Sequence, residues 1–472
     1  MRRALAAVGV AVGSLSCGSG SSDAQAVIRD ALVALGAAEL KSIQYSGTAQ
    51  EFALGQSERA DGPWPHLNDY YKLTFAADFA RSLSHTTFDS PDGRSGHTVL
   101  NQFSPWVYQL DVWTTPWGFL WGGLAHEPTV ESKTLDGRKY HVVTWMSSRS
   151  SPAGVPYRLV GYLNEQHLIE RVETSVEHPF FGDLPVEVKF EGYREFAGLK
   201  VPTKIIKVQA GWPTMETTIG NAVANPPKIG ELVRLSEPDR PVGPRPRPPA
   251  PEPVKSEKLA DGVYRILGDY VSLAVEFADH VVIIEAPGDD ARTTAVMAEA
   301  KRAVPGKPIR FVVNTHHHDD HAGGLAGYAA EGVTIITHER NKAYLERVLN
   351  GPRTLNPDLL ARSKRKAEFE TVGDSKVLKD ATRAIELHHV PDLKHADGML
   401  IAYLPKERMV VQADMGFIGK SAPGAGEHRA GTLVANLDRL KLNYETVVFI
   451  HRPQPDQKVT RADLLKLAAS EK

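Results

Sequence analysis

The stretch that most constrains this chain is Thr315–His321, because it concentrates four histidines and two aspartates in seven residues. The preceding segment, Ile309–Asn314, is short, apolar and rich in β-branched residues, which is typical of a buried strand. The following segment, Ala322–Leu325, is expected to open a helix. The cluster is therefore predicted to lie at the C-terminal end of a strand, where open α/β sheets place their functional sites.

Imidazole and carboxylate groups in one cluster are ligands for zinc, manganese or iron. On an irregular loop, His316 and His318 can both turn toward one ion, whereas Asp320 and His321 would face a second ion close by. A passive, metal-scavenging histidine tract is the alternative, but such tracts are usually of low complexity and lack a strand before them and a helix after them. A purely structural cluster would bury crowded charged groups that all need partners. The sequence therefore favours a metal centre.

The pattern His-x-His-x-Asp-His after a strand resembles the metallo-β-lactamase superfamily, and the resemblance covers residues 256–472. It implies an αββα sandwich with a two-metal site between its sheets. Strand-like runs before the motif, at Val263–Leu267, Val271–Phe277 and His280–Glu285, resemble the opening β-meander of that superfamily. The family usually carries an aspartate where this chain has Glu285.

Three further ligands follow from the resemblance, each at a strand end or beside a turn. His395 precedes a small-residue turn and a strand-like run, and His388 and His389 are its rivals within an earlier strand. Asp414 ends a strand, as the bridging aspartate of the dinuclear members does. His451 also ends a strand, but the family usually continues with glycine and this chain continues with arginine.

The resemblance implies two ions, zinc by default with iron or manganese as alternatives. A thiolate ligand is not expected, because Cys17 is the only cysteine. A water molecule shared by the ions would become the attacking hydroxide, and Asp320 would be the catalytic residue that orients it. His317 and Asp319 are expected to point away from the ions. The implied ligands of the first ion are His316, His318 and His395, those of the second are Asp320, His321 and His451, and Asp414 bridges the two.

A proline-rich run, Glu237–Pro253, divides the chain, because neither a helix nor a sheet tolerates so many prolines. It predicts an extended polyproline II spacer over residues 237–255. The spacer separates a β-rich domain, residues 27–236, from the metal domain, residues 256–472. With such a spacer, each domain is expected to fold by itself.

The first domain is predicted to be a mainly antiparallel β-sheet, and a resemblance of its later strands, given below, implies a β half-barrel. The fold class of the chain is therefore mixed α+β and α/β. Val186–Glu191 alternates between apolar and charged residues, the pattern of a strand with one wet face. The run Tyr193–Ile205 resembles the late strands of periplasmic lipoprotein-carrier proteins, which are half-open barrels with an apolar concave face. Val27–Ala38 has the apolar face of a helix. The aromatic segment Phe103–Trp121 is either a ligand or partner surface or ordinary core packing with a lid.

The first residues have the pattern of a secretory signal peptide over residues 1–26. Met1–Arg3 is basic, and Ala4–Val12 is an apolar run too short to span a bilayer. Two processing routes fit this pattern. One is cleavage after the A-x-A sequence Ala24–Ala26, and the other is acylation of Cys17 in the lipobox-like sequence Ser14–Gly18. Both predict a protein outside the cytoplasm, periplasmic or secreted in the first case and held at a membrane by a lipid anchor in the second.

The charge balance gives no support for nucleic acid as a partner, since the net charge is −2. A small-molecule substrate is expected, and export favours hydrolysis of a β-lactam, a lactone or another ester or amide. The loops Gly351–Lys366 and Gly416–Gly431 would select it. Two alternatives stay open: a periplasmic ligand-binding protein with a scaffold metal domain, and a mono-iron dioxygenase, which would leave His321 and His451 without a function.

Overall fold

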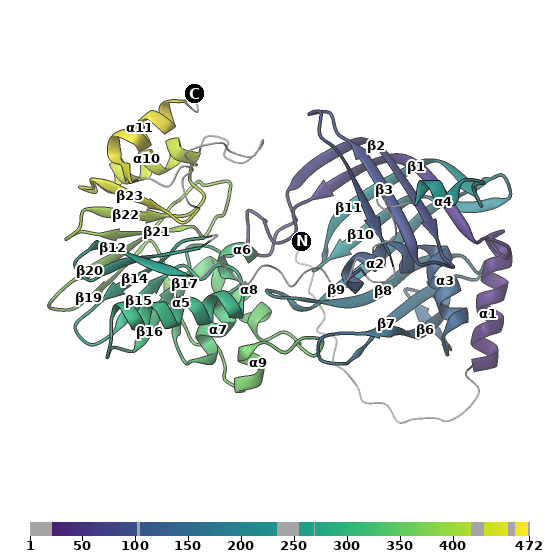
Figure 1. Cartoon of the computed structure of the whole chain (residues 1–472), viewed down its shortest axis with the longest axis horizontal. Helices are drawn as coiled ribbons and strands as arrows, with labels where there is room; N and C mark the ends of the chain where they lie inside the picture. The colour runs from purple at the N-terminus through teal and green to yellow at the C-terminus, as the bar shows by residue number, and fades with distance from the viewer. Residues whose placement is uncertain are drawn as a thin grey trace.

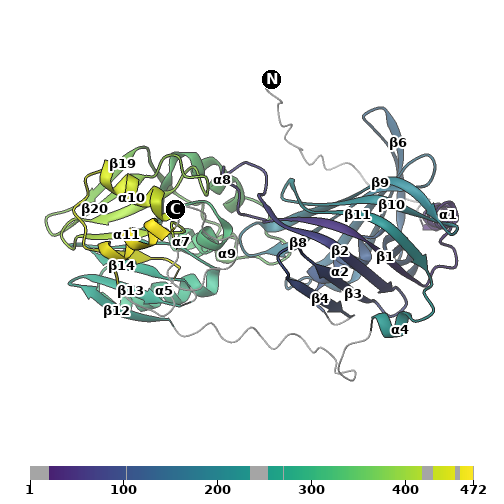
Figure 2. The ribbon, with the colours of Figure 1, turned by 90° about the horizontal axis from the view of Figure 1, so that it is seen from above.

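The computed structural model describes residues 21–101, 104–233, 254–268, 270–416, 429–451 and 458–470. Figures 1 and 2 show two domains side by side, one from the N-terminal half of the chain and one from the C-terminal half. Most of the expected signal peptide, with Cys17, lies outside the described residues. The same holds for nearly all of the proline-rich spacer and for residues 417–428 of the second expected loop.

The N-terminal domain is built on one 11-stranded sheet with the order β4-β3-β2-β1-β11-β10-β9-β8-β7-β6-β5. Every neighbouring pair is antiparallel, so the predicted mainly antiparallel domain is confirmed. The strands are β1 (Ser42–Phe52), β2 (His66–Asp78), β3 (Leu83–Asp89), β4 (Ser95–Leu100), β5 (Thr129–Leu135), β6 (Arg138–Ser150), β7 (Pro156–Leu163), β8 (Ile169–His178), β9 (Gly182–Phe196), β10 (Leu199–Gln209) and β11 (Trp212–Ala224).

The alternation expected for Val186–Glu191 is present in β9. Val186, Val188 and Phe190 are buried in the domain core, while the charged residues between them are half-buried on the other face. Because successive side chains of a strand point to opposite faces, this pattern gives the sheet one apolar side that needs a cover.

Helices cover that apolar side: α1 (Ser21–Ala34), α2 (Trp106–Trp113) and α3 (Pro116–Ala125) pack on it, whereas α4 (Ile229–Leu232) is a short turn near the spacer. In Figure 1, α2 and α3 lie between β3 and β7, inside the curve of the sheet.

Three aromatic side chains of the segment, Trp106, Trp117 and Phe119, belong to the core, whereas Tyr108 is exposed. Trp117 and Phe119 are fully buried, and Trp106 stacks on Tyr157 with ring centroids 5.2 Å apart. Helix α3 begins where Thr115 caps it by accepting a hydrogen bond from the backbone N–H of Gly118 at 3.0 Å. Of the two interpretations of this segment, packing therefore holds for these side chains.

The A-x-A sequence at Ala24–Ala26 lies inside α1, and the side chain of Ala24 is fully buried. The helix thus starts earlier than the expected Val27. Among the described helices, none is both long and apolar enough to span a membrane.

The C-terminal domain contains a seven-stranded and a six-stranded sheet, each with a parallel and an antiparallel part. The first is made of β12 (Lys255–Ala260), β13 (Val263–Leu267), β14 (Ser272–Glu276), β15 (Val281–Ile284), β16 (Ile309–Val313), β17 (Thr334–His338) and β18 (Phe369–Val372). The second is made of β19 (Ser375–Lys379), β20 (Ala384–His389), β21 (Leu400–Leu404), β22 (Met409–Gln412), β23 (Thr446–Phe449) and β24 (Val459–Thr460).

Three apolar layers join these elements into the predicted αββα sandwich. One layer, which includes Ile284 and Leu400, lies between the two sheets. A second packs the first sheet against helices, and a third, with Leu433, packs the second sheet against helices. The helices of the first face are α5 (Asp290–Ala303), α6 (Asp319–Ala322), α7 (Leu325–Ala330), α8 (Glu339–Leu349) and α9 (Leu359–Ser363), and those of the second face are α10 (Arg429–Arg439) and α11 (Arg461–Ser470).

The two domains are packed together, a contact that the sequence did not predict. Ala60 and Phe180 of the N-terminal domain belong to the core between the first sheet of the C-terminal domain and its helices. Conversely, Leu355 belongs to the core of the N-terminal domain. Spacer composition could not reveal this, since it says nothing about the surfaces that the spacer joins.

Part of the expected substrate loop, Gly351–Lys366, forms this domain contact. The backbone N–H of Asp183 donates to the carbonyl oxygen of Pro352 at 2.8 Å, and that of Ala153 donates to the carbonyl oxygen of Leu355 at 3.0 Å. Residues 352–355 are therefore committed to the N-terminal domain.

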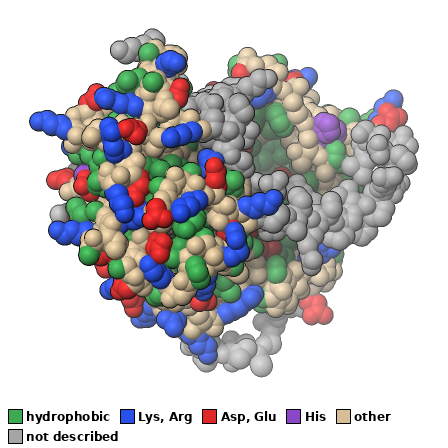
Figure 3. Space-filling view, turned by 60° about the vertical axis from the view of Figure 1, so that its left-hand side comes forward, with side chains coloured by type: hydrophobic (Ala, Val, Ile, Leu, Met, Phe, Trp, Pro, Cys, Tyr) green, Lys and Arg blue, Asp and Glu red, His purple; other side chains and the backbone are tan. Residues whose placement is uncertain are grey.

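On the face of the C-terminal domain seen in Figure 3, basic and acidic side chains are interspersed.

Candidate metal centre

The candidate ligands follow strands of both sheets at one end of the sandwich. The motif follows β16, in a parallel part of the first sheet, and its last residues, Asp319–His321, lie in α6. Asp414 follows β22 and His451 follows β23, and these strands are parallel neighbours in the second sheet. His395 lies on the connection from β20 to β21. The carboxyl ends of parallel strands meet at one edge of a sheet, so residues far apart in the sequence are brought together.

Four of the predicted ligands form the first group, and their ligand atoms lie within 4.8 Å of one another. Nε2 of His395 is 2.8 Å from Oδ2 of Asp414, and Nε2 of His316 is 3.3 Å from the same oxygen. The ring of His318 lies beside both histidine rings, with centroids 4.5 Å from His316 and 4.4 Å from His395.

The other three predicted ligands form the second group, again within 4.8 Å. Nε2 of His321 is 3.1 Å from Nε2 of His451 and 3.5 Å from Oδ2 of Asp320. Asp414 connects the groups, because its Oδ2 is 3.2 Å from His321 and its Oδ1 is 2.7 Å from His451. All seven predicted ligands are thus brought together, with Asp414 between two sets of three.

The donor atoms of this cluster fit a cation. Within the described part of the chain, the buried atoms His316 Nε2 and His318 Nδ1 have no hydrogen-bond partner. Burial lowers the pKa of His316 to about 3 and that of His318 well below its usual value, so both rings are neutral, as metal ligands must be. Burial alone would raise the pKa of Asp414, but His321, His316 and His395 hold it well below the usual range. In the first group, a deprotonated carboxylate beside neutral imidazoles is a donor set for zinc or a similar divalent ion.

The raised pKa of His321 indicates where a cation would be held. Burial would lower the pKa of His321, but the carboxylates of Asp414, Glu285 and Asp320 hold it well above the usual value. A metal ion at this position would replace that proton.

The rival histidines lie outside the cluster. Nε2 of His388 is 3.2 Å from Glu386, and His389 stacks on His338 and donates to the carbonyl oxygen of Asp397 at 2.9 Å. In the parts of the chain with described coordinates, neither belongs to a group of potential ligands.

The two motif residues expected to point away from the ions also lie outside both groups. Nε2 of His317 donates to the carbonyl oxygen of Ser57 at 2.8 Å, and Asp319 accepts from Nε2 of Gln56 at 2.9 Å.

Glu285, which stands where the family usually carries an aspartate, has a supporting role in the structure. The Thr315 hydroxyl donates to Oε2 of Glu285 at 2.6 Å, and Nδ1 of His321 is 3.4 Å from that same oxygen. Because the hydroxyl hydrogen is used there, the Thr315 oxygen accepts from Nδ1 of His316 at 3.0 Å, which leaves Nε2 of His316 for the ion. The signal for this role in the sequence was an acidic residue at the end of an apolar strand.

Tyr270 and Gln56 also escaped the sequence analysis. The Tyr270 hydroxyl donates to Oδ2 of Asp320 at 2.9 Å, and Nε2 of Gln56 donates to Oδ1 at 2.8 Å. Together they fix the orientation of the Asp320 carboxylate. Nothing in the local sequence of either residue indicates this contact.

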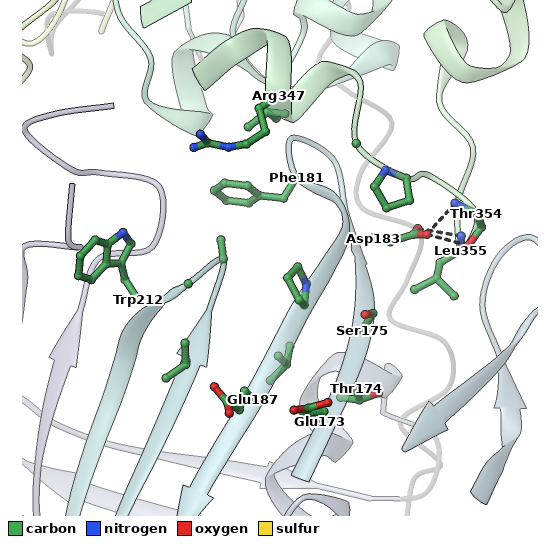
Figure 4. Close-up of a pocket in the computed structure, with 18 of the residues that line it drawn as sticks. Glu173, Thr174, Ser175, Phe181, Asp183, Glu187, Trp212, Arg347, Thr354 and Leu355 are labelled. Carbon is green, nitrogen blue, oxygen red and sulfur yellow. Dashed lines mark hydrogen bonds between the residues drawn. The ribbon is translucent and has the colours of Figure 1, made fainter. Parts of the chain in front are cut away.

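A separate cavity of about 1050 Å³ lies between the domains, bordered by Trp64, Phe181, Trp212 and Arg347 (Figure 4). Among the described residues that line it, none is one of the seven predicted ligands. The loop between β1 and β2 contributes to both places. Ala60, Asp61, Gly62 and Trp64 line the cavity, while Gln56 and Ser57 contact the metal motif.

Comparisons with known proteins bear on the second domain. A profile of the metallo-beta-lactamase superfamily matches residues 267–451. The alpha subunit of 2,4-dinitroanisole O-demethylase from Nocardioides sp. (strain JS1661) is 26% identical over 175 residues, which cover 36% of this chain and 46% of that protein. The chain therefore spans about half the length of this curated relative.

Among solved structures, the metallo-beta-lactamase FIM-1 from Pseudomonas aeruginosa in the mono-zinc form aligns with 19% identity and a TM-score of 0.37, covering 47% of this chain and 96% of that chain. The DIM-1 metallo-beta-lactamase aligns with 16% identity and a TM-score of 0.36, covering 46% of this chain and 98% of that chain.

Proposed function

We propose that residues 267–451, which match the metallo-beta-lactamase superfamily profile, form a dizinc hydrolase domain that opens a β-lactam, a lactone or another ester or amide. The observation that supports this most is the convergence of seven donor residues on two adjoining groups with Asp414 between them. A scaffold domain would have no need of a complete donor set. A mono-iron site would leave one of the groups without a purpose.

In this proposal, the first group of residues holds one zinc ion and the second group holds the other. Two such ions, when bound, lower the pKa of water and polarise a carbonyl group. His316, His318 and His395 would be ligands of the first ion and Asp320, His321 and His451 ligands of the second, with Asp414 shared.

Exposure indicates the side from which substrate arrives. The side chains of Asp320 and His451 are 29% and 26% exposed, whereas His316 and His321 are fully buried. Substrate would therefore approach over Asp320 and His451. Oδ2 of Asp320, held by Tyr270, would accept the proton of the attacking water at that open side.

The substrate class is tested by a reporter panel on purified protein with and without added zinc. The panel holds a chromogenic cephalosporin, an aryl lactone, an aryl ester, a bis-aryl phosphodiester and, because the curated relative is named as a dinitroanisole O-demethylase, an aryl methyl ether. We expect zinc-dependent turnover of at least one carbonyl substrate. Turnover of the phosphodiester or the ether alone would overturn the proposed substrate class.

Metal analysis tests the cofactor independently of substrate. The two donor groups predict two zinc ions per chain after reconstitution. One tightly bound iron and no zinc would contradict the dizinc proposal and support the oxygenase alternative.

We also propose that the protein is exported to the periplasm or beyond. Cleavage after Ala26 would remove the first turns of α1, including the buried Ala24, whereas processing at Cys17 would leave α1 whole. Mass spectrometry of the protein isolated from its native cell decides between the two processing routes. An intact Met1 in that sample would overturn export.

A further inference from the structure

The loop that joins β1 to β2, residues 53–65, reaches from the N-terminal domain onto the metal motif. Its base is closed by a hydrogen bond from the backbone N–H of Ala53 to the carbonyl oxygen of Pro65 at 2.9 Å. Nε1 of Trp64 donates to the carbonyl oxygen of Gln209 at 3.0 Å, which ties the loop to the N-terminal sheet. Ala60, near the far end, is buried in the core of the C-terminal domain. The loop is therefore held by both domains.

One contact sets the orientation of a first-group histidine. The carbonyl oxygen of Ser57 accepts from Nε2 of His318 at 3.0 Å, and Ser57 itself is fully buried. Because Nε2 carries the hydrogen, Nδ1 of His318 has its lone pair free, and Nδ1 is the atom without a partner in the described structure. A backbone carbonyl that fixes the tautomer of a ligand histidine is a common support of metal sites.

A second contact sets the orientation of a second-group carboxylate. Nε2 of Gln56 donates to Oδ1 of Asp320 at 2.8 Å and to Oδ1 of Asp319 at 2.9 Å. Gln56 thus separates two neighbouring carboxylates with an amide and leaves Oδ2 of Asp320 facing His321, at 3.5 Å.

The loop backbone approaches the motif too closely for a side chain at one position. Gly55 has φ +81°, and a Cβ atom there would lie 2.4 Å from Oδ1 of Asp319. One residue after Ser57, the carbonyl oxygen of Glu58 accepts from the backbone N–H of Asp397 at 2.8 Å, which joins the loop to the segment that carries His395. The loop therefore contacts four residues of the motif, His317–Asp320, and the segment that carries His395.

We propose that the N-terminal domain completes the metal centre, with Gln56 as a positioning residue for Asp320 and the Ser57 carbonyl as the support of His318. The proposal rests on the ligand set of the proposed function. The N-terminal domain would then support metal binding through hydrogen bonds to the ligand residues, without supplying a ligand itself. Loss of such supporting contacts commonly lowers metal affinity by about 10–100-fold.

The test compares Gln56→Ala with Gln50→Ala in the full-length protein. Gln50 lies on β1 in the same domain, and its Nε2 contacts Asp69 at 3.0 Å, away from the motif. Zinc affinities would be measured by competition with a chromophoric chelator, and the ligand field by the visible spectrum of the cobalt-substituted protein. We expect the affinity of one zinc site in Gln56→Ala to fall about 10–100-fold, with a changed cobalt spectrum, and Gln50→Ala to match the unsubstituted protein.

Gln56→Glu is the second variant, because it keeps the size of the side chain and removes the two N–H donors. Thermal unfolding in chelator, where no metal contributes, checks that each variant is folded. Unchanged affinities and cobalt spectra in folded Gln56→Ala or Gln56→Glu would overturn the inference and leave the dizinc proposal intact. Absence of metal binding in the unsubstituted protein would instead overturn the proposed function.

Discussion

Oδ2 of Asp183 accepts two hydrogen bonds from Thr354, one from its backbone N–H at 2.9 Å and one from its hydroxyl at 2.7 Å. Asp183 lies at the start of β9, directly after its first residue, and Thr354 lies on the connection from α8 to α9. Nearby, Nη2 of Arg353 donates to the carbonyl oxygen of Phe180 at 2.9 Å. These bonds hold the domains in the arrangement that brings residues 53–65 to the metal motif.

Asp183→Ala should weaken the domain contact, because it leaves the Thr354 donors without their acceptor. Hydrogen bonds to a charged group contribute about 1.5–3 kcal/mol each, so we expect the free energy of unfolding to fall by about 2 kcal/mol after allowance for water that replaces the carboxylate. Calorimetry of the full chain measures this. Glu165→Ala, at an exposed turn between β7 and β8, is the control, and equal losses in both variants would show that Asp183 has no special role.

His178 should make the packed domains sensitive to acid. Its Nδ1 accepts from the backbone N–H groups of Phe180 and Phe181 at 3.2 and 3.3 Å, and burial, with a smaller effect from Arg353, lowers its pKa from 6.5 to about 4. The unfolded chain therefore binds the proton more readily, so this contribution to stability is complete above pH 6.5 and is lost as the pH falls through about 4. The full loss amounts to about 3 kcal/mol.

His178→Asn provides the control for that pH dependence, because the amide oxygen can accept the same hydrogen bonds and does not titrate. Denaturant unfolding between pH 4 and pH 7 should show a shallower decline in the variant than in the unsubstituted protein. Identical slopes would contradict the assignment.

His395→Ala should remove one metal ion, whereas His388→Ala should not. The ring of His395 faces Asp414 in the first group, while that of His388 pairs with Glu386 outside it. Elemental analysis after reconstitution with zinc compares the two. A lower metal content in the His388 variant, with His395→Ala unaffected, would mean that the third histidine of the first site is misassigned.

Asp320→Ala should reduce turnover more than it reduces metal at the first group. The change removes one donor of the second group and the carboxylate held by Tyr270, while His316, His318 and His395 stay in place. Removing one positioned catalytic group commonly costs about 10²–10⁴-fold in rate, so turnover of the substrate found in the panel should fall by at least about that order.

His317→Ala is the comparison within the same motif. The His317 side chain faces Ser57 and lies outside both donor groups, so the loss of turnover should be much smaller than for Asp320→Ala. The reverse order of activities would show that the ligand assignment is wrong.

Local patterns determined much of this molecule. The alternation of Val186–Glu191 and the apolar run before Thr315 predicted strands correctly, because a side-chain period depends only on neighbouring residues. The spacing within Thr315–His321 likewise predicted which side chains of the motif would gather and which would turn away. The spacing of donor residues on one loop depends only on neighbouring positions, so it can be predicted from the sequence alone.

Contacts between distant segments could be decided only by the tertiary structure. Ser57 and His318 are separated by 261 positions, and a glutamine such as Gln56 looks like any polar loop residue until a carboxylate lies beside it. The supporting role of Glu285 was not predicted for the same reason, since that role depends on Thr315 and His321 packing against it. The proline-rich run predicted a division of the chain, but whether the two domains pack together depends on the shapes of Phe180, Ala60 and Leu355 and the cavities that receive them, which exist only after both domains have folded.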